Sequence, residues 1–164
     1  PLNVTVFDIN ELIRRVVIRY LDRMEEGGIE PEIEFKQEYC YVSADSDRIE
    51  QVIVNLMDNA IKFTPPGGHI RIWTHTGQDK VMVSVSDDGG GIAQEDIPFI
   101  FDRFYKADKS HTDKRGTGLG LAIVKGILDQ HGESIQVTSK PGSGTTFAFT
   151  LKAAQRPARE EPKK

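Results

Sequence analysis

The stretch SDRIEQVIVNLMDNAIKF, residues 46–63, is the most informative segment of this 164-residue sequence. Its apolar residues recur at a spacing that places them on one face of an α-helix, which predicts a helix with a buried stripe. The stripe consists of Ile49, Val52, Ile53, Leu56, Met57 and Ala60. Asp47 and Glu50 are spaced to form a capping box at its start. The following segment Thr64–Gly68 contains two prolines, which cannot continue the helix.

A second, polar stripe lies beside the buried one and contains Asn55, Asn59 and Lys62, at positions i, i+4 and i+7. Asparagine is unfavourable inside a helix because its amide competes with the backbone for hydrogen bonds. An asparagine oxygen suits Mg²⁺, which prefers hard oxygen ligands, and a lysine can pair with a phosphate. The stripe therefore indicates a functional site, the alternative being a polar face exposed to solvent.

The rest of the chain separates into helical and extended segments. Helices are predicted over 8–26, 97–104 and 118–130, and strands over 32–36, 40–44, 70–76, 81–86, 134–138 and 145–151. Helices packed on a mostly antiparallel sheet make an α+β two-layer sandwich. Residues 1–152 are expected to form one domain, and the polar segment 153–164, with two prolines, a disordered tail.

A glycine-rich segment, Asp87–Asp88–Gly89–Gly90–Gly91–Ile92, directly follows a predicted strand. Gly89 and Gly91 would let the backbone approach a flat ligand closely. An ionised Asp87 only accepts hydrogen bonds, which suits an exocyclic amine such as that of adenine. The alternative is a tight turn.

A second glycine-rich segment, Gly116–Thr117–Gly118–Leu119–Gly120–Leu121, leads into the last predicted helix. Unpaired amides at a helix N-terminus form an anion site, and four basic residues precede this one: Lys106, Lys109, Lys114 and Arg115. The segment matches neither GxxxxGK[ST] nor GxGxxG. A flexible turn before a helix is the alternative.

Composition narrows the class of protein. A net charge of −4 argues against a general nucleic-acid binder, whose surface is usually basic. The single Cys40 cannot form an internal disulfide, which fits a cytoplasmic location, and the four histidines lack metal-ligand spacing. No apolar run is long enough to span a bilayer, so membrane attachment is expected only through segments outside this chain.

Five segments, taken in order, resemble the ATP-binding catalytic domain of bacterial sensor histidine kinases, a family related to DNA gyrase and mismatch-repair ATPases. They resemble its asparagine box, first glycine box, phenylalanine box, second glycine box and third glycine box, and span 55–65, 87–92, 100–106, 116–121 and 142–147. The resemblance implies a mixed, mostly antiparallel sheet with about three helices on one face and a lid over the nucleotide. Asp88 departs from the family, which more often has asparagine there, and we expect this change to be tolerated.

The resemblance also implies roles for individual residues. Asn59 would ligate Mg²⁺, Asn55 and Lys62 would lie near the phosphates, and Lys106 would reach in from the lid. The adenine would contact Phe63 and Asp87, with Thr145 assisting through water, close to the backbone of Gly89, Gly91 and Ile92. The phosphate oxygens would be held by the amides of the second glycine box: Gly116, Thr117, Gly118, Leu119, Gly120 and Leu121.

The implied function is transfer of the γ-phosphoryl group of Mg-ATP to a histidine on an adjoining dimerisation domain, and from there to a response regulator. None of the four histidines here has the family's phosphoacceptor context, so that domain is expected to lie outside this chain. The hydrolytic relatives have a water-activating glutamate where Asn55 stands, and an amide cannot act as a general base. Two alternatives remain: an anti-sigma-type serine kinase or ATPase, and a degenerate nucleotide-binding docking module.

Overall fold

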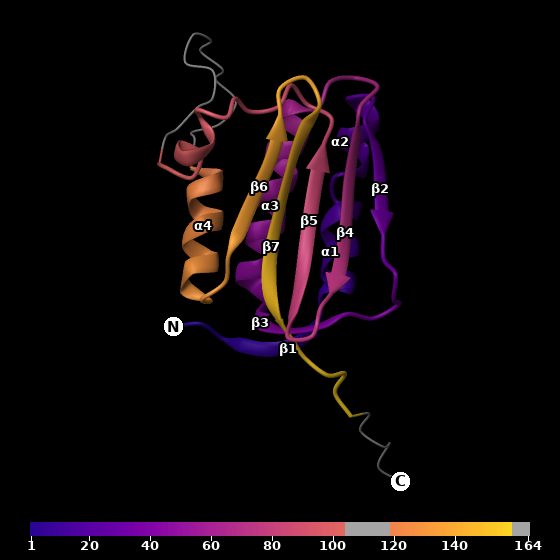
Figure 1. Ribbon diagram of the computed structural model, residues 1–164. Helices are drawn as coiled ribbons and strands as arrows, with labels where there is room; N and C mark the ends of the chain where they lie inside the picture. Colours follow the sequence, from indigo (N-terminus) through magenta and orange to yellow (C-terminus); the bar gives the residue numbers. More distant parts are fainter. Residues whose placement is uncertain (104–118, 159–164) are drawn as a thin grey trace.

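The computed structural model describes residues 1–103 and 119–158, which form a layer of helices packed on one face of a sheet (Figure 1). The helical elements are α1 Ile9–Ile18, α2 Leu21–Glu26, α3 Ser46–Phe63, the 3-10 helix η1 Ile97–Phe99 and α4 Gly120–Gln130. The strands are β1 Val4–Asp8, β2 Glu30–Glu34, β3 Tyr41–Asp45, β4 His69–Thr76, β5 Lys80–Asp87, β6 Ile135–Lys140 and β7 Gly144–Ala153. The predicted α+β sandwich is confirmed.

The sheet is mixed, since β2 and β4 run parallel while the other paired strands run antiparallel. Among the described residues its strand order is β1-β3-β7-β5-β4-β2, and β6 pairs with β7 outside this path. Strand β5 pairs with one edge of β7. Two strands share the other edge: β6 pairs with the first part of β7, and β3 pairs with its last residues. The carboxyl ends of β5 and β6 therefore lie together, next to the start of β7.

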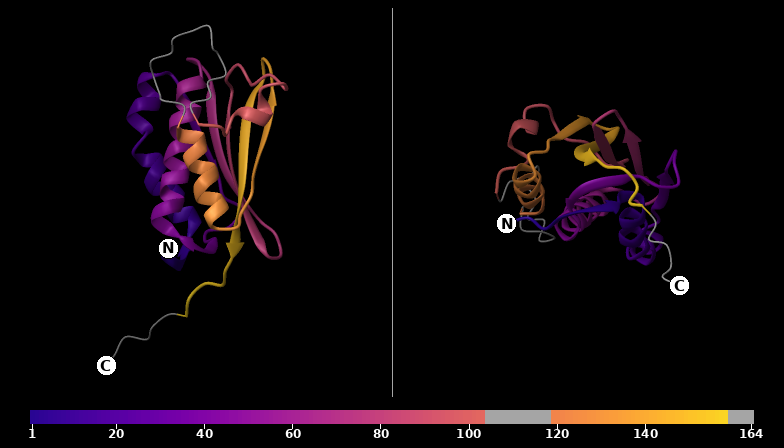
Figure 2. Two further views of the ribbon diagram at one scale, coloured as in Figure 1. Left: turned by 90° about the vertical axis from the view of Figure 1, so that its left-hand side faces the viewer. Right: turned by 90° about the horizontal axis from the view of Figure 1, so that it is seen from below.

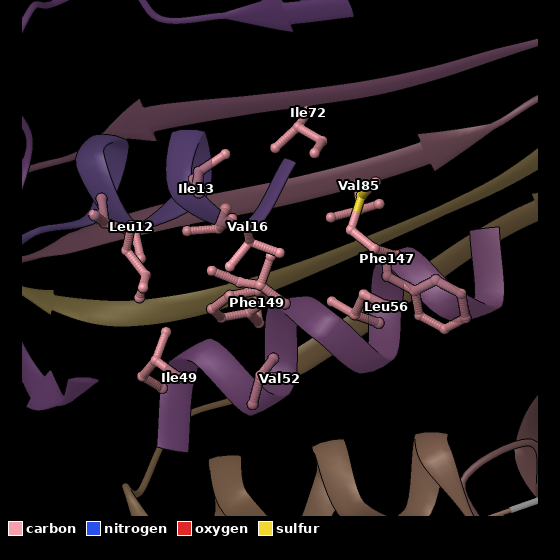
Figure 3. Packing of buried hydrophobic residues seen from close by; sticks show 14 of the residues in the cluster. Leu12, Ile13, Val16, Ile49, Val52, Leu56, Ile72, Val85, Phe147 and Phe149 are labelled. Carbon is pink, nitrogen blue, oxygen red and sulfur yellow. The ribbon is translucent and has the colours of Figure 1, made fainter. Parts of the chain in front are cut away.

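The core lies between the helices and the sheet (Figure 3). Strands β4, β5 and β7 alternate buried and less buried residues, as expected of strands with one covered face. Apolar side chains of α1 and α3 pack against the inward residues of these strands, and the labelled members are Leu12, Ile13, Val16, Ile49, Val52, Leu56, Ile72, Val85, Phe147 and Phe149.

Helix α3 has the predicted bounds, but its cap differs from the prediction. The N-cap is Asp45, the last residue of β3, whose Oδ1 accepts from the Arg48 amide at 3.3 Å. The predicted capping box of Asp47 and Glu50 is therefore wrong, because the chain passes directly from strand into helix and the N-cap lies two residues earlier. At the other end, the Thr64 hydroxyl donates to the Ala60 carbonyl at 2.7 Å.

The single helix predicted over 8–26 is two helices, α1 and α2, separated at Arg19 and Tyr20. Asp8 caps α1 as its position suggests, accepting from the Asn10 amide at 3.0 Å. The Tyr20 side chain is buried, and its hydroxyl donates to Asp58 Oδ1 at 2.9 Å. This long-range contact joins the break between α1 and α2 to α3.

Candidate nucleotide-binding site

Asp87 ends strand β5 with its side chain pointing into the helix–sheet interface, where the residue is 5% exposed. Burial raises the pKa of this carboxyl to about 6, hydrogen bonds from the Gly89 and Thr145 amides lower it, and the charge of Asp88 raises it. The Gly89 amide donates to Asp87 Oδ1 at 2.8 Å. Asp87 is thus a buried acceptor that is ionised at neutral pH despite an unfavourable environment.

Gly89 brings this segment against the end of α3. A Cβ placed on Gly89 would lie 2.6 Å from the Phe63 carbonyl oxygen and 2.8 Å from Asp87 Oδ1, so a larger residue would separate them. The Phe63 side chain is 46% exposed, and Lys62 Nζ lies 5.3 Å from the centre of its ring. The backbone at Phe63 and the buried Asp87 carboxylate therefore come together where α3 and β5 end, and the same last turn of α3 carries an exposed aromatic ring and a lysine.

The segment after Gly89 is fixed to the turn between β6 and β7. Gly91 has a φ of +78°, and a Cβ there would overlap the Lys140 carbonyl oxygen, so both conformation and space require glycine. The Gly142 amide donates to the Gly90 carbonyl at 2.8 Å. The first and third glycine-rich segments thus contact each other directly.

Ser139 is a residue of this region that the sequence analysis missed. Its hydroxyl accepts from the Ile92 amide at 2.6 Å, and its carbonyl accepts from Gln94 Nε2 at 2.8 Å. The hydroxyl also lies 2.8 Å from the Thr145 hydroxyl. The only local signal was a serine at an inward-facing position of a strand whose other inward residues are apolar.

The asparagine stripe of α3 faces the start of α4. Asn55 Nδ2 donates to the Gln51 carbonyl at 2.9 Å, and a Cβ on Gly120 would lie 3.3 Å from Asn55 Oδ1. Asn59 is half-buried one turn closer to Phe63. Leu119 is the N-cap of α4, and within the described part of the chain no side chain caps this helix. The N-terminus of a helix is a place where backbone amides can receive an anion.

These features lie at one end of the molecule. The end of α3, the start of α4 and the carboxyl ends of β5 and β6 lie on the same side (Figures 1 and 2). Leu121, in the first turn of α4, packs against the core there. Four predicted site residues fall outside the described residues: Lys106, Gly116, Thr117 and Gly118.

The oxygen-bearing side chains at this end include the amide of Asn59 on α3, which could serve as one ligand of a metal ion. In the described ranges no group of three or more His, Cys, Asp or Glu residues could hold a metal ion. His69 Nδ1 is paired with Asp88 Oδ2 at 2.8 Å, and His131 Nε2 accepts from the Asp45 amide at 3.0 Å. An asparagine oxygen would supply one hard ligand while phosphate oxygens and water supply the others.

Comparison with known proteins identifies the class. Residues 44–155 match the family described as "Histidine kinase-, DNA gyrase B-, and HSP90-like ATPase". The chain belongs to this family, and it is the catalytic ATPase domain of a sensor histidine kinase. Within the described residues, no helix is both long enough and apolar enough to cross a membrane.

Individual relatives agree with this assignment. The chain is 39% identical over 151 residues to the sensor protein SrrB of Staphylococcus aureus, covering 92% of this chain and 26% of that protein. It thus spans about a quarter of the length of the curated relatives it matches. The catalytic domain of histidine kinase ThkA superposes with a TM-score of 0.82 at 36% identity, over 92% of this chain and 96% of that one. Full-length ShkA in complex with AMPPNP superposes with a TM-score of 0.83 at 30% identity, over 97% of this chain and 33% of that one.

Proposed function

We propose that this domain binds Mg-ATP at the end of the sandwich where α3, α4 and β5 meet, and donates the γ-phosphoryl group to a histidine of an adjoining dimerisation domain. The observation that carries the proposal is the close approach of Gly89 to both the Phe63 carbonyl and the Asp87 carboxylate, which brings the end of α3 to the buried acceptor at the end of β5. The family membership and the AMPPNP complex of the similar kinase ShkA support it.

Each group at this end would have a distinct role. Asp87 would accept a hydrogen bond from the adenine amine, and the exposed ring of Phe63 would lie against the base. Gly89, Gly91 and Ile92 would form the backbone wall beside it. The first-turn amides of α4, from Leu119, Gly120 and Leu121, would hold phosphate oxygens together with the second glycine-rich segment.

Phosphoryl transfer needs positioning and charge stabilisation more than covalent help from the protein. Asn59 would ligate the magnesium ion, whose charge offsets that of the phosphates when bound. Asn55, beside the start of α4, and Lys62 would orient and neutralise the phosphate chain. Because Asn55 is neutral, it cannot activate water, so we expect slow hydrolysis and retention of ATP for the histidine acceptor.

The domain that would accept the phosphoryl group, and the protein that would receive it next, are also proposals. The similar kinase ThkA has been solved in complex with the response regulator protein TrrA, with a TM-score of 0.78 to this chain at 34% identity. We infer that a dimerisation domain and a response regulator are the protein partners here. This domain would act on the cytoplasmic side of the membrane, where ATP is available.

Nucleotide binding is tested by titrating the chain with AMPPNP in the presence of Mg²⁺. Asn59→Ala removes the proposed magnesium ligand, and we expect it to abolish magnesium-dependent binding without changing the melting temperature. Gln51→Ala is the matched control, since it removes an exposed amide two turns earlier on α3. Equal binding by Asn59→Ala and the parent would contradict the site.

The transfer step is tested by incubating the chain with labelled ATP and a separately produced dimerisation domain. Phosphohistidine is lost in acid whereas phosphoserine survives, so an acid-labile product is expected. An acid-stable product would instead indicate a serine kinase. Binding of AMPPNP without any transfer would indicate a docking module.

A further inference from the structure

Three buried polar side chains form a row across three neighbouring strands. Ser139 of β6 is the register partner of Thr145 of β7, and Thr145 is the register partner of Asp87 of β5. The three residues are 7%, 6% and 5% exposed. Register partners present their side chains on the same face of a sheet, so the row faces the helices.

The hydrogen bonds of Ser139 favour one arrangement of the hydroxyl protons in this row. The Ile92 amide donates to Ser139 Oγ at 2.6 Å. Ser139 Oγ donates its own proton to the Gly144 carbonyl at 3.1 Å. Either hydroxyl can donate in the 2.8 Å contact between Ser139 and Thr145, but a hydroxyl has one proton, so Ser139 keeps both this contact and its bond to Gly144 only when Thr145 donates.

A Thr145 hydroxyl that donates to Ser139 has only lone pairs left for a ligand. Its neighbour in the row, Asp87, also offers only lone pairs when ionised. The two partners together therefore present hydrogen-bond acceptors and no side-chain donor. Adenine carries an amine donor at its six-position, whereas guanine carries a carbonyl acceptor there.

We propose that Ser139 is a positioning residue that sets the preference of this site for adenine over guanine, by holding the Thr145 hydroxyl as an acceptor. The inference rests on the proposed nucleotide-binding function and deepens it. Ser139 acts through Thr145, whose hydroxyl would meet the base directly. A guanine carbonyl placed at this row would face two acceptors and remain unpaired, which opposes its binding.

Removing the Ser139 hydroxyl frees the Thr145 proton. In Ser139→Ala the Thr145 hydroxyl can rotate and donate to a guanine carbonyl, because its present acceptor is gone. One hydrogen bond gained for guanine changes the ratio of affinities by about tenfold. The preference for AMPPNP over GMPPNP should therefore fall by that amount, mainly through tighter binding of GMPPNP.

The test is a titration of the full chain with Mg-AMPPNP and with Mg-GMPPNP, comparing the ratio of their dissociation constants. The variants are Ser139→Ala, Thr145→Val and the double variant, and Thr138→Ala is the control because it removes an exposed hydroxyl from the adjacent position of β6. We expect Ser139→Ala to lower the ratio, Thr138→Ala to preserve it, and Ser139→Ala to have no further effect on it in the Thr145→Val background.

The outcomes separate the two proposals. If the parent binds neither analogue, the nucleotide-binding function fails. If the parent prefers AMPPNP and Ser139→Ala preserves that preference, the role of Ser139 is overturned while the function stands. If Ser139→Ala lowers the preference for AMPPNP equally in the Thr145→Val background, the role of Ser139 is also overturned, since Ser139 would not be acting through Thr145. Should Ser139→Ala fail to fold, Ser139→Cys keeps the volume with a much weaker hydrogen-bonding group, and the same fall is expected.

Discussion

The inward-facing rows of β5, β6 and β7 change character at one end of the sheet. Along β5 the buried residues Val81, Val83 and Val85 are followed by Asp87. Along β7 the apolar residues Leu151, Phe149 and Phe147 are followed, toward its start, by Thr145, and along β6 Ile135 and Val137 are followed by Ser139. One end of the interface is thus an apolar core, and the other is equally buried but polar.

Burial therefore serves two purposes in one continuous layer. At the apolar end, removal from water stabilises the fold, at about 25 cal/mol per Å² of apolar surface. At the polar end, the same burial raises the pKa of Asp87 to about 6, which shows that its ionised form is disfavoured there. A group kept ionised against that cost is suited to a ligand that pairs with it.

The largest effect is expected from a change that breaks the apolar end. Phe149 is 0% exposed and lies in the centre of the core (Figure 3). Phe149→Ala should lower the free energy of unfolding by about 3–5 kcal/mol, because it loses buried surface and leaves a cavity. Urea unfolding measures this loss, and AMPPNP affinity under folding conditions should be unchanged. A loss below about 1 kcal/mol would be at odds with the packing described.

Asp87→Asn is the opposite case, since it should affect binding more than stability. It replaces a charged acceptor by a neutral one, and AMPPNP affinity should fall about 10- to 100-fold. The raised pKa of Asp87 means that its ionised form destabilises the unliganded fold at pH 7, so Asp87→Asn should not lower the free energy of unfolding. Calorimetric titration and urea unfolding provide the two readings.

Asp88→Asn is the control for Asp87→Asn, because it neutralises the exposed adjacent carboxylate and should alter AMPPNP affinity little. A marked loss of stability in Asp87→Asn with unchanged affinity would reverse the distinction between the two ends.

Two adjacent glycines at the polar end, Gly90 and Gly91, should respond differently to substitution by alanine. Gly91→Ala introduces a Cβ at a φ of +78° against the Lys140 carbonyl, and should cost about 1–3 kcal/mol of stability and weaken AMPPNP binding. Gly90→Ala is the matched control, because a Cβ there would meet nothing within 4 Å. Thermal unfolding of both variants tests this. Equal behaviour of the two would show that the Gly91 contact with β6 is unimportant.

The smallest expected effect is that of pH on AMPPNP affinity. AMPPNP affinity should be constant above the Asp87 pKa of about 6 and fall up to about tenfold per pH unit below it, because binding requires the ionised carboxylate. Phosphate groups of the analogue also titrate, so the parent is compared with Asp87→Asn at each pH. The ratio of their affinities should shrink below pH 6 as the parent loses its charge. A ratio independent of pH would mean that Asp87 does not pair with the ligand.

The free energy of unfolding should depend on pH in the opposite sense to AMPPNP affinity. A carboxyl whose pKa is raised from 3.8 to about 6 binds its proton more readily in the folded state. The stabilisation from this proton is fully present below pH 3.8 and is lost as pH rises through about 6. Ligand-free stability from this group should therefore decrease over that window, and Asp87→Asn should remove the contribution.

The parts of the fold that local patterns determine were predictable. Helix α3 was predicted at its observed bounds, because an apolar stripe and two following prolines delimit it. Strand β1 was missed although Val4 and Val6 alternate with Thr5, because the strand has only five residues and is placed by a distant pairing, that of Val4 with Asp45 of β3. The break between α1 and α2 involves Tyr20 and Asp58, which are 38 residues apart, and no local pattern reports such a contact.

In the site too, local patterns predicted some residues, whereas residues set by distant contacts were missed. Asp87 and the glycines fit either a tight turn or a ligand-binding segment and were selected by their order among the other boxes, and the structure places Gly89 against the Phe63 carbonyl and Asp87. Ser139 did not stand out, because its contact with Ile92 spans 47 residues and a serine in a strand is unremarkable by itself. Only the register of β6, β7 and β5 reveals that it belongs to a row with Thr145 and Asp87.

The central claim is that one nucleotide contacts the end of α3, the end of β5 and the start of α4 together. It is tested most directly by following the backbone amide resonances of the labelled chain during titration with Mg-AMPPNP. We expect the amide resonances of Phe63, Gly89, Gly120 and Thr145 to shift with a single affinity, and those of the apolar end to remain unchanged. Shifts confined to the apolar end, or separate affinities for Gly89 and Gly120, would contradict it.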